Sequence, residues 1–289
     1  VLRRSRLVDR STRPFSSLWR RSLQTHLFDS SAAPKPQRKD GRRWAALAWN
    51  GVVFVLFAAA LALAVHFAAA DVTLADVGTT LLLGLATLAR VVVLIAIASL
   101  VWVPIGVWVG TRPQVANMVQ PLAQFLAAFP ANLLFPIVVS AIVALRLDPN
   151  IWLSPLMILG TQWYILFNVI AGAAAIPAEM RAVGANLRVR GFLWWRRIAL
   201  PAVFPYYVTG AITASGGSWN ASIVAEVASW GNEHLQADGL GAYIAKQTEA
   251  GDFHRIVLGI AVMSLFVVVV NRAFWRPLYR YAERKFRVG

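Results

Sequence analysis

The polar side chains that could contact a solute lie inside long apolar segments of this 289-residue chain. Asn220 offers a hydrogen-bond donor and an acceptor, and Ser218 offers a hydroxyl, so the two could orient a small polar solute without a fixed charge. Glu226 adds an ionisable group near the end of the same apolar segment. Polar groups in such surroundings usually face a cavity or the protein interior. These residues therefore predict either the lining of a solute path or hydrogen bonds between helices.

Phe129 and Pro130 mark a weak point in the backbone of another apolar segment, residues 113–145. Proline removes a backbone hydrogen bond and clashes with the preceding turn. In lipid, such a break persists only where protein or a water-filled cavity satisfies the freed carbonyl groups. We therefore predict a short helix, a break at 129–131 and a second helix ending near Leu145. The predicted substrate path consists of Phe129, Pro130, Ser218, Asn220 and Glu226.

The sequence lacks the residues that metal binding, nucleotide binding or enzyme catalysis requires. The chain has no cysteine, and its four histidines do not show the i, i+4 spacing of a helical metal site. No Gly-x-x-x-x-Gly-Lys-Ser/Thr motif occurs, and Gly216-Gly217 does not follow a strand, so close helix packing explains this pair better than phosphate binding. No cluster of nucleophile, base and metal ligands can be assembled. We predict no enzyme activity, no metal and no cofactor, with energy supplied by another chain.

Composition and charge indicate a membrane protein. The chain is 58% hydrophobic and 14% charged, whereas soluble domains carry about 25% charged residues. Residues 44–70, 91–111 and 113–145 contain no Asp, Glu, Lys or Arg, and a spanning helix needs about 20 apolar residues. The net charge of +15 is concentrated in 1–43, 181–197 and 272–289, which is typical of cytoplasmic segments. We predict an all-α polytopic membrane protein that does not bind nucleic acid.

Six crossings with both termini in the cytoplasm satisfy this charge distribution. The predicted crossings are 44–70, 91–110, 113–145, 151–176, 201–224 and 255–271. Residues 71–90 are predicted to be external or to form an outer helical extension, and 225–255 a Gly-rich external loop. Arg90 is predicted to be an interfacial anchor or an anion contact. Residues 1–43 are predicted to form a basic cytoplasmic N-terminal segment or linker, and residues 44–289 the transmembrane domain.

The cytoplasmic segment 176–200 is longer than an ordinary helix connection. Met180–Leu187 predicts one short helix, and Gly191–Leu200 predicts a second helix with tryptophans and arginines suited to the membrane interface. Pro201 then begins the next crossing, where its missing N–H costs little.

This segment resembles the coupling loop of ABC importer permeases, in which Glu-Ala-Ala, three residues, Gly, nine residues and Ile-x-Leu-Pro follow one another. Ile198-Ala199-Leu200-Pro201 matches the end of that pattern, whereas Ala182-Val183-Gly184 and Arg188 occupy the Glu-Ala-Ala and glycine positions. In the family, this loop forms a helix that sits in a groove of the ATPase subunit. The resemblance implies the following ATPase-coupling residues: Glu179, Ala182, Gly184, Leu187, Arg188, Gly191, Ile198, Leu200 and Pro201.

Further motifs within residues 75–289 resemble the nitrate/sulfonate/taurine/bicarbonate branch of the family. They are Gly106-x-x-x-Gly110, Phe129-Pro130, Ser218-Trp219-Asn220, Ile223-Val224-Ala225-Glu226 and Gly239-Leu240-Gly241. The runs 216–226 and 271–279 look most like the second half of a fused double permease.

The resemblance implies a type I ABC importer permease of the bacterial inner membrane that crosses the lipid bilayer several times. Its implied partners are ATPase subunits that bind ATP, a second permease unit (a homodimer partner or a fused half) and an extracytoplasmic solute-binding protein. The implied substrate is a small anion such as nitrate, sulfonate/taurine or bicarbonate. The alternative is a secondary, ion-coupled transporter, which needs ionisable residues deep in the membrane. The deepest candidate, Glu226, is predicted near the outer edge.

Overall fold

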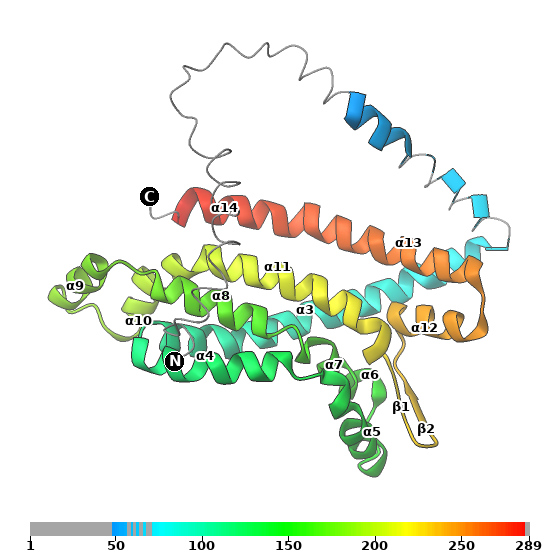
Figure 1. Cartoon of the computed structure of the whole chain (residues 1–289), viewed down its shortest axis with the longest axis horizontal. Coiled ribbons are helices and arrows are strands. Elements are labelled where there is room, and N and C mark those ends of the chain that lie inside the picture. Colours follow the sequence, from blue (N-terminus) through cyan, green and yellow to red (C-terminus); the bar gives the residue numbers. More distant parts are fainter. Residues whose placement is uncertain (1–47, 57–58, 60–61, 64–65, 68–70, 287–289) are drawn as a thin grey trace, which may run out of the picture. The chain divides into compact units, whose positions relative to one another are not determined.

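The computed structural model describes residues 48–56, 59, 62–63, 66–67 and 71–286 (Figure 1). The chain divides into two units, residues 1–62 and residues 63–289. In the first unit, residues 48–56 are helical. The predicted segment 1–43 and much of the predicted crossing 44–70 lie outside the described residues, so both stay predictions.

Helix α3 (Leu74–Gly110) begins at a capping box. The Thr73 hydroxyl accepts from the Asp76 N–H (3.2 Å), and the Asp76 carboxylate accepts from the Thr73 N–H (2.9 Å). Its 37 residues make a helix about 55 Å long, well beyond the roughly 30 Å of a hydrocarbon core. Residues 74–90 are therefore helical, as the second of the two predictions for residues 71–90 requires, whereas their position outside the membrane stays a prediction.

The predicted break in the third apolar segment is confirmed. Helix α4 (Pro113–Ala128) ends before Phe129 and Pro130, and a short 3-10 turn, η2 (Ala131–Leu134), leads into α5 (Phe135–Ala144). The two parts of the segment meet at 77°.

The segment predicted as the fourth crossing, residues 151–176, is divided in the structure. It contains α6 (Pro149–Trp152), α7 (Ser154–Leu159) and α8 (Trp163–Ala174), with a 46° bend after α7. Polar side chains satisfy the irregular backbone there, as a break at membrane depth requires. The Gln162 side chain accepts from Trp102 Nε1 (2.9 Å) and donates to the Leu159 carbonyl oxygen (3.2 Å).

Segment 176–200 contains the first predicted short helix, but the second one is not separate. Helix α9 (Ala178–Asn186) stands alone. Helix α10 (Gly191–Trp194) continues through a π-helical turn, η3 (Trp195–Ala199), into α11 (Leu200–Ala225). The resulting helix runs over 35 residues, and Pro201 follows directly on the π-helical turn, in which the Leu200 N–H donates to the Trp195 carbonyl oxygen.

The predicted Gly-rich external loop contains regular structure. Strands β1 (Val227–Trp230) and β2 (Glu233–Gln236) form an antiparallel hairpin in which Trp230 pairs with Glu233. Gly231 makes the two-residue turn with a φ of 62°, a conformation that glycine adopts without strain. Helix α12 (Leu240–Ala250) follows. The chain ends in α13 (Phe253–Val270), a π-helical turn η4 (Asn271–Trp275) and α14 (Arg276–Phe286).

Within residues 63–289, α11 lies at the centre and packs against α8, α3, α12 and α14 (Figure 1). The Gly106-x-x-x-Gly110 motif lets α3 approach α8 closely. A Cβ atom at Gly106 would lie 2.6 Å from Cγ1 of Val169, and one at Gly110 would meet the carbonyl oxygen of Ile170.

Among the described residues, three helices are long and apolar enough to cross a membrane: Leu74–Gly110, Gly191–Ala225 and Phe253–Phe286. Counting each of the two bent pairs as one span raises the number to five. Residues 44–70 would supply the sixth, so six crossings and cytoplasmic termini stay predictions.

Candidate functional site

One exposed face of α11 carries small and polar residues. They recur every three or four positions, which places them in a single stripe along the helix: Tyr206, Thr209, Thr213, Gly216 and Asn220. The hydroxyls of Thr209 and Thr213 donate to carbonyl oxygens of their own helix, at 3.1 and 3.0 Å. These hydrogen bonds engage the donor of each hydroxyl, although both side chains are exposed. We call these five residues the α11 stripe.

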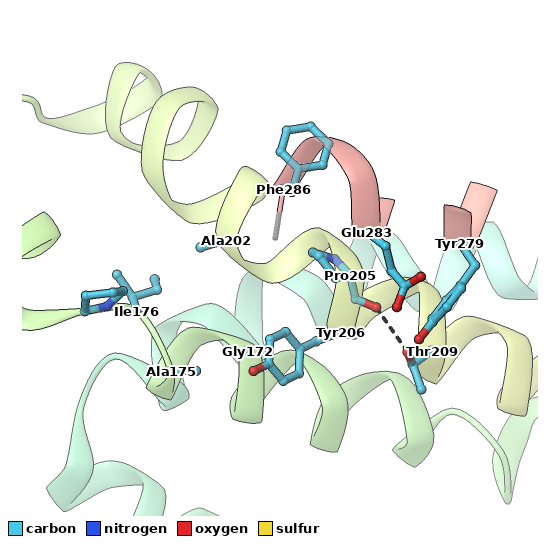
Figure 2. A pocket seen from close by; sticks show the side chains of 11 residues that line it. Gly172, Ala175, Ile176, Ala202, Pro205, Tyr206, Thr209, Tyr279, Glu283 and Phe286 are labelled. Atoms are coloured by element: carbon cyan, nitrogen blue, oxygen red, sulfur yellow. Dashed lines mark hydrogen bonds between the residues drawn. The ribbon is translucent and has the colours of Figure 1, made fainter. Parts of the chain in front are cut away.

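The α11 stripe begins at a cavity of about 560 Å³ at the end of the bundle nearest α9 (Figure 1). Three helices line this cavity: α8 with its C-terminal end, α11 with its first turns, and α14 along its length. Figure 2 shows Tyr206 and Thr209 of α11 on one side and Tyr279 and Glu283 of α14 on another. Ile176 and Pro177, directly before α9, also line it. A displacement of α9 would therefore change the shape of this cavity.

The predicted path residues do not share one surface. Asn220 is exposed on the α11 stripe, and Phe129 and Pro130 are exposed at the break after α4. Ser218 is fully buried, its hydroxyl 3.0 Å from that of Thr161 and donating to the Ala214 carbonyl oxygen (2.9 Å). Helical residues two positions apart face different directions, which separates Ser218 from Asn220.

Glu226 lies in a buried ion pair with Arg90 of α3. Arg90 Nη1 is 3.0 Å from Glu226 Oε1, and the two side chains are 13% and 2% exposed. Oε1 also accepts from the Thr87 hydroxyl (2.8 Å), and Oε2 accepts from the Ala242 N–H (3.1 Å). Buried charges are tolerated when they are paired and hydrogen-bonded in this way.

The other donors of Arg90 are also engaged. Its Nε and Nη2 atoms donate to the carbonyl oxygen and Oδ1 of Asn150, at 3.2 and 3.0 Å, and Nη1 donates to the Asp238 carbonyl oxygen (3.0 Å). The structure thus corrects both predicted roles of Arg90, because its guanidinium is hydrogen-bonded to Asn150, Glu226 and Asp238 of the same chain. We call Thr87, Arg90, Asn150, Glu226 and Asp238 the Arg90–Glu226 cluster.

Close contacts at the start of α12 explain the two glycines of the Gly239-Leu240-Gly241 motif. A Cβ atom at Gly239 would overlap the Glu226 carboxylate, and one at Gly241 would overlap the backbone of Ser222. Without side chains there, the N-terminus of α12 comes close enough for its Ala242 N–H to reach Glu226. The carboxylate therefore caps α12 from a different helix, where the helix dipole favours negative charge.

A second, more exposed ion-pair group lies at the start of α13. Arg255 Nη1 is 2.6 Å from Asp252 Oδ2, and Nη2 is 3.5 Å from Asp76 Oδ2. Asp252 is the N-cap of α13, and hydrogen bonds from the backbone N–H and side chain of Arg255 lower the pKa of its carboxyl group. In the described part of the chain, no three His, Asp or Glu side chains are arranged to hold a metal ion.

The predicted coupling residues are mostly exposed, and a buried contact between Gly184 and Ile198 joins the two helical parts of their segment. Gly184 is the buried residue of α9, and a Cβ atom there would lie 2.7 Å from Cδ1 of Ile198 in η3. Ile198 is itself buried, at 8% exposure. The following coupling residues are exposed: Glu179, Ala182, Leu187, Arg188, Gly191 and Leu200. Helix α9 therefore rests on the start of the α11 helix through Gly184.

Arg188, which stands at the glycine position of the family pattern, has a φ of 52°. This left-handed conformation costs an ordinary residue roughly 1–2 kcal/mol, whereas glycine adopts it readily. We expect Arg188→Gly to raise the free energy of unfolding by about 1 kcal/mol, measured by thermal unfolding of the purified chain. The control is Arg190→Gly, because Arg190 has a φ of −132° and gains nothing from glycine. Equal effects of both substitutions would contradict the explanation.

Comparisons with known proteins agree with the resemblance in the motifs. A family profile described as binding-protein-dependent transport system inner membrane component matches residues 102–288. The bicarbonate transport system permease protein CmpB of Synechococcus elongatus is 29% identical over 188 residues, 65% of this chain and 64% of CmpB. The nitrate import permease protein NrtB of a Synechocystis strain is 26% identical over 202 residues, 69% of this chain and 70% of NrtB. The predicted likeness to nitrate and bicarbonate permeases is confirmed, whereas the likeness to half of a fused permease stays a prediction.

Proposed function

The chain belongs to the family of binding-protein-dependent transport system inner membrane components, and we propose that it forms the membrane path of an ABC importer. In this proposal, separate ATPase subunits bind and hydrolyse ATP, and an extracytoplasmic binding protein delivers the substrate. A second permease unit completes the path. The matched segment spans 64% of the length of CmpB, and the family is one of transport components, not of enzymes.

The α11 stripe is the observation that carries this proposal. Polar residues in a membrane helix usually face a cavity or another protein surface, because contact with lipid leaves them without hydrogen-bond partners. The proposed path follows this face of α11 from Asn220 to the cavity at Tyr206 and Thr209, with the second permease unit opposite. Phe129 and Pro130 are proposed to line its wall. Ser218 and Glu226 are left out of the path, because their polar atoms bond to other helices.

The proposed substrate is a small anion of the nitrate or bicarbonate kind, since relatives of this chain are permeases for those two ions. Glu226, the deepest acidic candidate of the sequence, is paired with Arg90 and is therefore not free to bind a coupling ion. This pairing argues against an ion-coupled transporter.

The path proposal predicts different outcomes for two neighbouring substitutions in α11. In proteoliposomes that contain the permease, its ATPase and its binding protein, Asn220→Ala should raise the KM for nitrate or bicarbonate uptake severalfold and leave thermal stability unchanged. Ser218→Ala should leave KM unchanged but lower the free energy of unfolding by about 1 kcal/mol, because a buried hydrogen bond is lost. A normal KM with early unfolding for Asn220→Ala would remove Asn220 from the path.

A further inference from the structure

Helix α4 has two exposed edges that differ in chemistry. One edge carries the carboxamides of Gln114, Asn117 and Gln124, which are all exposed, and we call it the α4 amide edge. These residues are three and seven positions apart, which keeps them on one side of an α-helix. The other edge carries Met118 and Leu122, whose side chains are 78% and 59% exposed. Large apolar side chains suit contact with lipid, whereas carboxamides do not.

The α4 amide edge extends far into the apolar part of its span. Helix α4 starts at Pro113 and is the first part of one of the two bent spans. Gln124 lies about 16 Å along the helix axis from Pro113, about half of the roughly 30 Å of a hydrocarbon core. A carboxamide both donates and accepts hydrogen bonds, and lipid supplies no partner for either. Polar side chains at such a depth therefore face a water-filled cavity or another protein surface.

Helix α8 lies between α4 and α11, and we call these three helices the α4–α8–α11 layer (Figure 1). Phe167 of α8 packs against the apolar cluster that includes Ala123 of α4. Gly172, on the opposite side of α8, lies against Tyr206 of α11. The exposed Ala171 falls between these two contact directions, because successive helical residues turn by about 100°. The layer therefore has an open side at Ala171.

The α4 amide edge and the α11 stripe both turn to this open side. Helix α3 closes the opposite side, where Val169 of α8 lies against Gly106. Helix α4 and helix α11 each run opposite to α8, and α-helices are right-handed, so these contacts fix the direction of every side chain around the layer. The amide edge faces the open side, and the edge with Met118 and Leu122 faces away from it. Polar groups of α4 and α11 thus share one surface.

We propose that the α4 amide edge is a second polar wall of the transport path, in which Asn117 and Gln124 exchange hydrogen bonds with the hydrated solute. The inference rests on the proposed function, because it adds a wall on α4 to the path along the α11 stripe. Carboxamides can stand in for water molecules of a hydration shell without holding the solute by charge. Weak contacts that are repeated along a path let a solute enter and also leave.

The test uses the absence of cysteine from the chain, because a single introduced thiol then reports on one position. Asn117→Cys and Gln124→Cys place a thiol on the amide edge, and Met118→Cys and Leu122→Cys place one at similar depth on the lipid edge. Each assembled transporter in liposomes is treated with methanethiosulfonate ethylsulfonate, a charged reagent that attacks through the thiolate. The mass of the permease chain follows the reaction, and rates are compared with those of the same chains unfolded in dodecyl sulfate.

Gln124→Cys should react at least tenfold faster than Leu122→Cys, and Asn117→Cys faster than Met118→Cys, because a thiol ionises in water and stays neutral in lipid. Equal rates on the two edges would overturn the proposal. A disulfide between two Gln124→Cys chains that resist the reagent would also overturn it, because the edge would then be a contact with a second copy of the chain.

Uptake assays on the complete transporter separate this wall from the proposed function. Gln124→Leu should raise the KM for nitrate or bicarbonate uptake severalfold without loss of thermal stability, because the side chain is exposed. Met118→Leu, on the lipid edge, is the matched control and should leave the KM unchanged. Uptake by the unaltered transporter with an unreactive amide edge would refute the wall and leave the function standing. A reactive amide edge without uptake of either ion would support the wall and refute the proposed substrate.

Discussion

Arg90→Met is expected to lower the free energy of unfolding by about 3–5 kcal/mol, the largest loss of stability among the single substitutions considered for this chain. The substitution leaves Glu226, which is 2% exposed, as a buried carboxylate without its cation. It also removes the donors that bind Asn150 and the Asp238 carbonyl oxygen. The loss is measured as the shift of the unfolding transition in mixed detergent micelles, followed by circular dichroism.

Two further variants distinguish the effect of the unpaired Glu226 carboxylate from that of a general loss of packing. Arg90→Met combined with Glu226→Met should recover most of the lost stability, because removing both partners of a buried pair is far less costly than removing one. Arg255→Met tests the more exposed group, in which Arg255 is 33% exposed, and should cost far less stability than Arg90→Met, because solvent screens exposed ion pairs. Equal losses for Arg90→Met and Arg255→Met would show that burial of the Arg90–Glu226 cluster contributes nothing.

The sequence predicts those parts of the fold that depend on local backbone chemistry. Pro130 locates the break between α4 and η2, because proline removes a hydrogen bond wherever it stands. The apolar runs locate α3, α11 and α13. The β1–β2 hairpin was missed although Gly231-Asn232, a two-residue turn between short strand-like segments, is a known hairpin signal. The surrounding segment is acidic and Gly-rich, and this composition favoured the prediction of a loop.

Contacts between distant segments could not be predicted from one sequence. Arg90 and Glu226 lie 136 positions apart, and nothing local to either indicates that they pair. The same holds for Gly184 with Ile198. Asn220 and Ser218 looked equivalent in the sequence, and only the orientation of α11 distinguishes the exposed residue from the buried one.

Gly184→Leu is expected to reduce the ATPase activity stimulated by the binding protein at least tenfold, while basal ATP hydrolysis by the complex stays near its normal rate. Because a Cβ atom at Gly184 already lies 2.7 Å from Cδ1 of Ile198, a leucine must push α9 away from η3. Cδ1 is the far end of a flexible side chain and can turn away from a single methyl group, so the test uses leucine, which adds four carbon atoms. A tenfold loss corresponds to about 1.4 kcal/mol, which lies within the roughly 1–3 kcal/mol that overpacking of a buried site typically costs.

The decisive variant is Gly184→Leu combined with Ile198→Ala, which removes three carbon atoms from the other side of the contact. If α9 transmits force to α11 because it rests on η3, this double variant should regain much of the stimulated activity. Gly78→Leu serves as the matched control, because a Cβ atom at Gly78 of α3 meets nothing within 4 Å and coupling should stay normal. Assembly with the ATPase is checked by co-purification of each variant. Normal stimulation in Gly184→Leu, or no recovery in an assembled double variant, would show that the contact between α9 and η3 does not carry the coupling.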